Sequence, residues 1–418
     1  MQDIFITKIN IKEVRNIKDF EINLSETERK HLIITGKNGS GKTSLIAEIK
    51  QFLNQIVTGN AGSYNHWLKE ISLLETELEA RQNHGNFVEI ENIKIEIEGL
   101  ENKLKQFGET QISFNLQGES DKISKVINNQ IQKGLFTVKN FEVKHYIEMT
   151  EVKTLEKIKT KPFYSIDEKA GADFLQHIVN LQFDKLVAKD EEDTKSVINI
   201  ESWFENFEKQ LRELFDEPKL KLEFNRKKYN FSIIENGKEP YTFNQLSDGY
   251  SAILDIVTEL IMRMEEHKSK SYDVQGIVLI DEIETHLHVD LQKKILPFLT
   301  SFFPKIQFIV TTHSPFVLSS IKNSVICDLE NRIVTEDLSG YSYDTIVESY
   351  FDSNNYSDEF TNKINEYETL MRKDDLSDIE RDKLLDLEMY LESIPKYWAK
   401  EFAAKYQQIK LKNIGKRK

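Results

Sequence analysis

A glycine-rich octapeptide directly follows a short aliphatic run near the start of the chain. The octapeptide, residues 36–43, reads Gly-Lys-Asn-Gly-Ser-Gly-Lys-Thr, and the run before it is Leu32, Ile33 and Ile34. Glycine tolerates backbone conformations in which successive N–H groups turn towards one anion. A helix that begins near Lys42 directs its positive end at the same anion. The pattern predicts a buried strand, a phosphate-binding loop and a helix, and hence a nucleoside triphosphate site.

The side chains of this loop indicate how the nucleotide is held. Lys42 is expected to reach the terminal phosphates, and the hydroxyl of Thr43 to bind Mg²⁺. ATP and Mg²⁺ are therefore the predicted cofactors. The predicted nucleotide ligands in this segment are Gly36, Lys37, Asn38, Gly39, Ser40, Gly41, Lys42, Thr43 and Ser44.

A second aliphatic run far downstream ends in two carboxylates. Residues 276–282 read Gly-Ile-Val-Leu-Ile-Asp-Glu. Four aliphatic residues without alternation favour a central parallel strand that is covered on both faces. At its carboxyl end Asp281 would hold Mg²⁺ opposite Thr43, and Glu282 would act as general base on the attacking water. An acidic pair after a strand is also a common helix cap, so the upstream loop is needed to favour the functional interpretation.

The composition is that of a soluble chain with sizeable cores. With 418 residues, 39% of them hydrophobic and 30% charged, two or three domains are expected. We recognise neither the ~20 apolar residues of a membrane helix nor a secretory signal at the start. The single cysteine, Cys327, excludes an internal disulfide and a multi-cysteine zinc site. We therefore expect a cytoplasmic protein. The net charge of −14 argues against DNA binding over the whole surface but not against a local basic patch.

A third segment predicts another anion site. Residues 244–250 read Asn-Gln-Leu-Ser-Asp-Gly-Tyr and precede an apolar helix over about 251–264. The hydroxyl of Ser247, the amide of Gly249 and the helix amino terminus can together bind a phosphate, with Asp248 between them. Taken alone, such a sequence is more typical of an ordinary helix cap, but its position about thirty residues before the acidic strand favours the phosphate site.

Histidines follow the acidic pair and the next strand. His286 and His288 lie close after Glu282, and two histidines at this spacing without a third ligand are weak evidence for a metal site. The strand predicted over 308–312 ends at His313, which can contact a γ-phosphate or serve merely as a cap.

In this order the motifs resemble those of the SMC/RecF-like branch of the ABC-type ATPases, which also contains the OLD nucleases. The resemblance covers the head domain, roughly residues 1–60 and 183–328. More narrowly, the segments 244–255, 279–288 and 308–320 resemble the PtuA ATPases of the bacterial antiphage Septu systems. The AriA ATPases of the PARIS systems are a close second match.

The resemblance implies further roles for matching residues. Two ATP molecules would lie between two heads, each completed by Ser247 of the opposite subunit, with His313 on the γ-phosphate. The segment after Glu282 would be the D-loop at the dimer interface. A turn at Arg15 and Asn16 would approach the nucleotide, although a plain surface turn is as consistent with those residues. We recognise no Q-loop glutamine; the region 136–150 is the most suitable place for one.

The expected fold is an α/β, ABC-type P-loop ATPase head with a short antiparallel coiled-coil insertion and a C-terminal helical extension. Heptad-spaced apolar residues indicate two helices of ~18 residues, either a docking arm for a protein or a hairpin that packs on the head. The predicted divisions are an N-terminal lobe (1–62), the hairpin (63–110), the return to the head (111–182), a C-terminal lobe (183–345) and the extension (346–418).

These features predict an ATP-hydrolysing, head-dimerising ATPase with slow turnover. The PtuA resemblance implies that it serves antiphage defence and regulates a separately encoded nuclease. We find no nuclease motif after residue 328, so the chain itself is not expected to cut nucleic acid. Predicted partners are a second copy or a larger homo-oligomer, a nuclease and, through the complex, nucleic acid, but no membrane. The alternative is a RecF-like DNA-repair ATPase that binds DNA in an ATP-dependent way.

Overall fold

The structure is a computed structural model that describes most of the chain. The described residues are 3–81, 87–118, 120–143, 149–265 apart from 151, 153 and 159, 274–341, 345–346, 358–373 and 376–393. The chain forms two compact units, Met1–Tyr343 and Asp344–Lys418. The last residues of the predicted helical extension, 394–418, lie outside the described residues.

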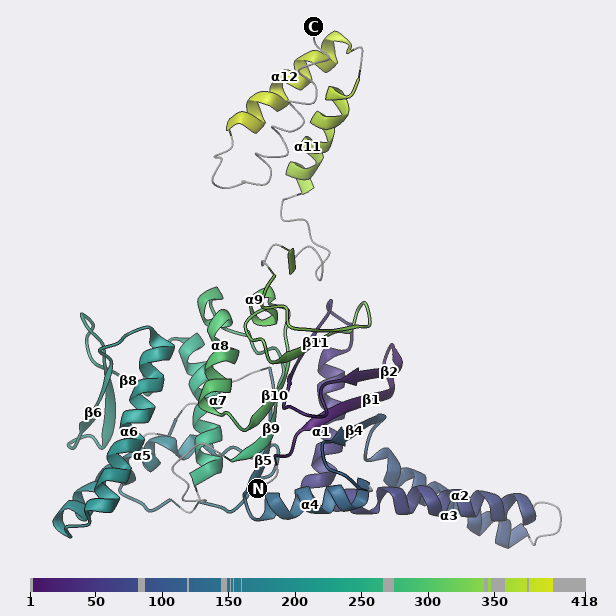
Figure 1. The fold of residues 1–418 in the computed structure, drawn as a ribbon, viewed down its shortest axis with the longest axis vertical. Coiled ribbons are helices and arrows are strands. Elements are labelled where there is room, and N and C mark those ends of the chain that lie inside the picture. The colour runs from purple at the N-terminus through teal and green to yellow at the C-terminus, as the bar shows by residue number, and fades with distance from the viewer. Residues whose placement is uncertain are drawn as a thin grey trace. The chain divides into compact units, whose positions relative to one another are not determined.

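A six-stranded sheet forms the centre of the first unit (Figure 1). Its order is β12-β11-β3-β10-β9-β5, and all neighbours are parallel except the edge strand β12. The three strands β3, β9 and β10 are buried along their whole length, as the unbroken aliphatic runs predict. The bounds are β3 His31–Thr35, β5 Phe136–Phe141, β9 Gln275–Ile280, β10 Ile306–Thr311, β11 Ser324–Asp328 and β12 Ile333–Glu336.

Helices cover both faces of this sheet. In Figure 1, α1 lies on one side and α7 and α8 lie on the other. Each carries an apolar stripe towards the sheet, and α7 buries nearly all of its side chains. The bounds are α1 Lys42–Val57, α7 Asp248–Met264, α8 Val289–Phe302 and the short α9 Pro315–Leu318.

Two antiparallel three-stranded sheets flank the centre. The order of one is β2-β1-β4 and that of the other is β6-β7-β8. The second packs with helices α5 and α6 through a cluster of aromatic rings. The bounds are β1 Ile6–Val14, β2 Ile17–Asn23, β4 Thr110–Phe114, β6 Lys221–Asn225, β7 Asn230–Ile234, β8 Tyr241–Thr242, α5 Phe174–Asp190 and α6 Thr194–Phe215. Single 3₁₀ turns span Asn60–Ser63, Gly171–Asp173 and Phe243–Gln245.

A helical hairpin, α2 (Tyr64–Arg81) and α3 (Phe87–Lys105), projects from the first unit in Figure 1. Apolar residues such as Ile71 and Ile93 are buried between its helices. Trp67 meets Phe107 at its base with ring centroids 6.1 Å apart. Helix α4 (Ser120–Gln132) follows, and β4 and β5 return the chain to the head sheets.

The second unit contains α11 (Asp358–Met371) and α12 (Asp378–Ser393), which pack on each other. The predicted fold class, an α/β ATPase head with a helical hairpin and a helical extension, is confirmed. Among the described residues, no helix is both long and apolar enough to cross a membrane.

Candidate functional site

The glycines of the loop between β3 and α1 have backbone conformations that other residues rarely adopt. Gly36, Gly39 and Gly41 have φ values of +138°, +87° and +103°. Gly41 is the residue directly before α1, so the loop turns sharply into the helix. These conformations point successive backbone N–H groups inward, and the helix adds its positive end. The loop therefore has the geometry of an anion site.

Lys42, the first residue of α1, lies within this loop rather than in solvent. Its Nζ donates hydrogen bonds to the carbonyl oxygens of Gly36 and Lys37, at 2.9 and 3.2 Å. Burial lowers the pKa of the Lys42 ammonium, while carboxylates led by Glu282 and Asp281 oppose that change. A cation that is nearly buried among acidic groups at a loop of inward N–H groups is suited to a terminal phosphate.

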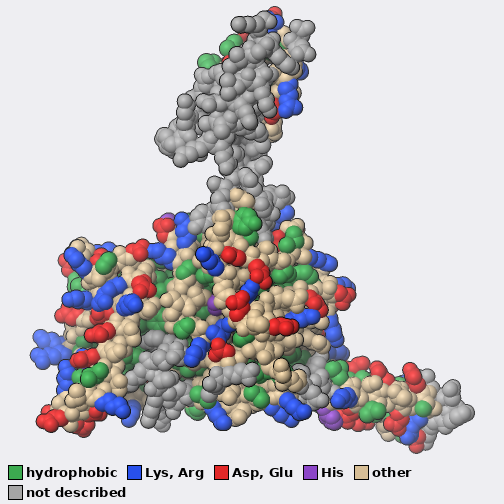
Figure 2. Space-filling view, viewed as in Figure 1, with side chains coloured by type: hydrophobic (Ala, Val, Ile, Leu, Met, Phe, Trp, Pro, Cys, Tyr) green, Lys and Arg blue, Asp and Glu red, His purple; other side chains and the backbone are tan. Residues whose placement is uncertain are grey.

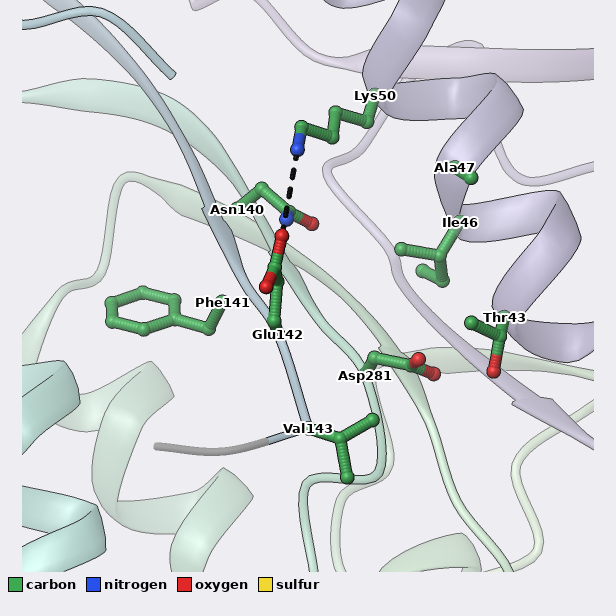
Figure 3. Close-up of a pocket in the computed structure, with 9 residues that line it drawn as sticks. All are labelled: Thr43, Ile46, Ala47, Lys50, Asn140, Phe141, Glu142, Val143 and Asp281. Carbon is green, nitrogen blue, oxygen red and sulfur yellow. Dashed lines mark ion pairs between the residues drawn. The ribbon is translucent and has the colours of Figure 1, made fainter. Parts of the chain in front are cut away.

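The predicted Mg²⁺ residues line one pocket of about 370 Å³. Thr43 comes from α1 and Asp281 from the end of β9, and Figure 3 shows their side chains pointing towards one another. Lys50 on α1 reaches across the same pocket to Glu142, with an Nζ–Oε1 distance of 3.8 Å. A threonine hydroxyl facing a carboxylate is a donor set that Mg²⁺ prefers.

The acidic pair is held by the neighbouring strand. Asp281 is only 4% exposed, and its Oδ1 accepts a hydrogen bond from the hydroxyl of Thr311, the last residue of β10. Glu282 has φ +49°, in the left-handed region, and its N–H donates to the same hydroxyl at 2.7 Å. The pair is therefore oriented by contacts from outside its own loop.

His313 lies on the loop after β10 and faces the same charges. Its backbone N–H donates to Oε1 of Glu284. Burial first, and then the charge of Lys42, lower the pKa of the His313 imidazole, whereas Glu284 and Glu282 oppose that change. A lowered pKa keeps the imidazole neutral at neutral pH, so it can donate or accept a hydrogen bond without carrying a charge.

Buried polar atoms that lack hydrogen-bond partners show whether these residues suit a magnesium nucleotide. The Ser40 hydroxyl in the loop and Oε2 of Glu284 are buried and have no hydrogen-bond partner among the described residues. Buried polar groups are normally satisfied, so both need a partner that these residues do not supply. Together with the loop and the Thr43–Asp281 pair, they fit a bound phosphate with its metal.

Comparison with known protein families shows which family this chain belongs to. A family described as "AAA domain, putative AbiEii toxin, Type IV TA system" matches residues 32–319, well over half of the chain. The chain belongs to this AAA domain family. The match begins in β3 and ends after α9, so it contains the loop, the acidic pair and His313.

Two curated proteins are similar to parts of this chain. "Septu protein PtuA" of Bacillus mycoides (strain KBAB4) is 46% identical over 88 residues, which are 21% of this chain and 12% of that protein. "Retron Vc95 probable ATPase" of Vibrio cholerae serotype O1 biovar El Tor is 39% identical over 103 residues, 23% of this chain and 19% of that protein. The chain thus matches less than a fifth of the length of either. The resemblance to PtuA predicted from the sequence is confirmed over this stretch.

Among solved structures, an SMC head bound to the C-winged helix domain of ScpA is similar over 81% of this chain and 100% of that one. The identity is 13% and the TM-score 0.40. A likeness of this degree carries no inference about the AAA domain described here.

The segment 244–250, which we call the signature segment, lies at the start of α7. Ser247 and Asp248 are exposed, and the Ser247 side chain makes no capping hydrogen bond to its own helix. Gly249 is buried; a Cβ there would lie 3.1 Å from the carbonyl oxygen of His286. None of these residues lines the Thr43–Asp281 pocket. Their assignment as a phosphate site stays a prediction.

The turn between β1 and β2 contacts the phosphate loop through a residue that the sequence did not single out. A Cβ on Gly41 would lie 3.3 Å from Cδ1 of Ile17. Arg15 and Asn16 are exposed, and the Asn16 carbonyl accepts a hydrogen bond from Arg332. Their predicted role at the nucleotide stays untested.

His286 and His288 are exposed on the loop before α8, and His288 pairs with Asp290. Within the described part of the chain, no group of three His, Cys, Asp or Glu side chains could hold a metal ion.

Sequence reasoning missed several residues of the site. Thr311 contacts both acidic residues, and Glu284 holds the His313 backbone. Asn140, near the end of β5, lines the pocket in the region where no Q-loop glutamine was recognised, and its Oδ1 is buried without a partner among the described residues. Residues 144–148 of that region lie outside the described residues. The strand ends were the available signal: Thr311 is the last residue of β10 and Asn140 the second-last of β5, both parallel strands of the central sheet.

Proposed function

We propose that this chain is a magnesium-dependent ATPase of an antiphage defence system, which dimerises through its heads and regulates a separately encoded nuclease. One observation carries the ATPase assignment: the glycine loop holds the buried Lys42, and Thr43 next to it faces the buried Asp281 across one pocket. Membership of the AAA domain family and the stretches similar to PtuA and a retron ATPase support it.

The residues divide the chemistry of hydrolysis between them. The loop N–H groups and Lys42 bind the phosphates and balance charge as it develops. Thr43 and Asp281 would hold Mg²⁺, which when bound neutralises phosphate oxygens and favours displacement. Glu282 accepts the proton of the attacking water, and neutral His313 orients groups at the γ-phosphate through a hydrogen bond.

The exposure of the signature segment supports dimerisation. Ser247 is exposed and directly precedes the 17-residue helix α7, whose amino terminus can receive an anion, and its side chain makes no capping hydrogen bond to that helix. An ATP on a second copy supplies that anion in our proposal. The nuclease partner rests on the resemblance to PtuA and on the absence of a recognised nuclease motif after residue 328.

Two variants test the ATPase assignment. Lys42→Ala should weaken ATP binding by at least ~100-fold, because the loop loses its only buried cation. Glu282→Gln should bind ATP as the wild type does but turn it over about 10²–10⁴-fold more slowly, since the general base is gone. Equilibrium binding of a fluorescent ATP analogue and phosphate release measure the two effects. Normal hydrolysis by Glu282→Gln would refute the assignment of the base.

Co-purification tests the partner. The chain is expressed together with the product of its neighbouring reading frame and sized by light scattering with and without ATP. A stable complex with a nuclease supports the proposal. A chain that stays alone and binds DNA only with ATP, with a steep salt dependence, favours the RecF-like alternative. On the face of the first unit seen in Figure 2, acidic and basic side chains are interspersed, which favours the proposal over that alternative.

A further inference from the structure

Thr311 occupies the junction between the phosphate loop and the acidic pair. It ends β10, which lies between β3 and β9 in the central sheet. Its side chain is fully buried, and its backbone is in register with Ile34, two residues before the loop. The carboxyl ends of parallel strands meet at one edge, so Thr311 can contact groups from both neighbours.

The direction of the hydrogen bonds around its hydroxyl follows from the donors available. The Glu282 N–H can only donate, so Oγ1 of Thr311 accepts that bond, 2.7 Å long. The single hydroxyl proton is then directed to Oδ1 of Asp281. A third bond runs from the N–H of Ile283 to the Thr311 carbonyl, at 3.1 Å. One residue therefore holds three successive positions of the acidic loop, and a hydrogen-bond chain of this kind strengthens its members.

These contacts matter because the backbone at Glu282 is strained. A φ of +49° is uncommon for a residue other than glycine and persists only where the surroundings hold it. The amide that donates to Thr311 is the amide of this strained residue. Release of the hydroxyl would free both the Asp281 carboxylate and the turn that directs the Glu282 side chain.

We infer that Thr311 is a positioning residue for hydrolysis: its hydroxyl fixes the metal-binding carboxylate and the general base in one arrangement. The inference rests on the proposed ATPase function and extends it to a residue that contacts neither nucleotide nor metal in our assignment. Its neighbour Thr312 is equally buried, but that hydroxyl accepts the N–H of Ser314 instead. Burial of a threonine at this strand end therefore does not by itself account for the contacts of Thr311.

Three variants separate positioning from packing. Thr311→Val keeps the shape of the side chain and removes the hydroxyl, whereas Thr311→Ser keeps the hydroxyl and removes a methyl group. Thr258→Val is the matched control: Thr258 is also fully buried, and its hydroxyl donates only to the Asp255 carbonyl within α7, at 3.3 Å. Thermal melting of all three identifies any general loss of stability.

The first measurement is hydrogen exchange of the nucleotide-free chain, which needs neither metal nor turnover. Peptides covering residues 281–285 should exchange about tenfold faster in Thr311→Val than in the wild type, because the Glu282 amide has lost its acceptor. Thr311→Ser and Thr258→Val should retain the wild-type rate there.

The second measurement is the Mg²⁺ dependence of ATP binding and hydrolysis. Thr311→Val should lower kcat by about 10–100-fold and raise the Mg²⁺ concentration for half-saturation by a similar factor, as loss of a contact behind a metal ligand commonly does. The KM for ATP at saturating Mg²⁺ should change by less than about threefold, since the loop and Lys42 are untouched. Thr311→Ser should restore both values.

The outcomes are distinct. If Thr311→Val matches Thr258→Val in exchange, kcat and Mg²⁺ dependence, the inference is wrong while the proposed function stands. If Thr311→Ser is as impaired as Thr311→Val, the methyl packing matters and the hydroxyl does not, which also overturns it. A wild-type chain that binds no magnesium ATP overturns the proposed function and the inference together.

Discussion

At the scale of single residues, Gly36 is a position of the phosphate loop that has little room for a side chain. Its φ of +138° disfavours any other residue, and a Cβ there would lie 2.8 Å from Oγ of Ser40 and 3.2 Å from the N of Glu330. The second contact is backbone, so it cannot move aside easily. The loop conformation thus depends on the absence of a side chain.

Gly36→Ala should therefore weaken ATP binding by at least about tenfold, because the strain of about 1–3 kcal/mol and the clash both fall on the phosphate loop. Gly39→Ala is the matched control, since Gly39 also has a positive φ, +87°, but no atom lies within 4 Å of its Cβ position. Titration with a fluorescent ATP analogue measures the affinity of both variants. Equal affinities for the two variants would show that the contacts at Gly36 do not shape the loop.

At the scale of elements, a buried ionic network joins α7 to the central sheet. Glu259 of α7 accepts the N–H groups of Ala170 and Gly171, each at 2.7 Å, and pairs with Arg263 at 2.7 Å and Lys139 at 3.4 Å. One turn earlier, Asp255 is also buried, and its Oδ1 has no hydrogen-bond partner in the part of the chain that the structure describes. Burial first, and then the charge of Glu259, raise the pKa of the Asp255 carboxyl to about 7, while Lys169 and Lys139 oppose that change.

This raised pKa gives a pH dependence with a definite sign. The folded state favours protonated Asp255, so its contribution to stability is complete below the ordinary pKa of 3.8 and is lost as the pH rises through about 7. Asp255→Asn resembles the protonated form. It should raise the free energy of unfolding at pH 8, by up to about 4 kcal/mol, and the gain should shrink towards pH 4.

Urea unfolding at pH 4, 6 and 8 measures this difference. Asp290→Asn, whose side chain is 74% exposed, shows the effect of the same substitution on the surface. A gain for Asp255→Asn that is constant from pH 4 to pH 8 would contradict the titration of Asp255.

The elements differ in how far local sequence determines them. The phosphate loop and β9 were predictable because each is specified by adjacent residues, a glycine pattern or an aliphatic run. The partners of Asp281 were not, since Thr311 lies 30 positions away and is joined to it only by the pairing of β9 with β10. The same holds for the packing of Ile17 on Gly41 and for the network around Glu259. Sequence patterns predict the groups to which we assign the chemistry, whereas the groups that orient them depend on the tertiary fold.

At the scale of the whole molecule, the lobes contribute different parts of the proposed mechanism. The loop, the acidic pair and His313 converge in one head, while exposed Ser247 directly precedes α7 and does not line the Thr43–Asp281 pocket. A complete site therefore requires a second copy in our proposal. The isologous pairing of two identical heads would place two such sites across one interface.

Mixing two inactive variants tests this arrangement. Lys42→Ala cannot bind ATP, and Ser247→Arg binds ATP but blocks the phosphate site at the start of α7, so each alone should be inactive. In a mixed dimer, the loop of the Ser247→Arg chain faces the intact Ser247 of its partner. Half of randomly formed dimers are mixed and each has one intact site, so an equimolar mixture should regain about a quarter of the wild-type phosphate release.

As a control, wild type is mixed with the chain that carries both substitutions, where every mixed dimer has two defective sites and activity should fall. If the first mixture stays inactive while light scattering shows mixed dimers, Ser247 does not complete the site of the opposite chain.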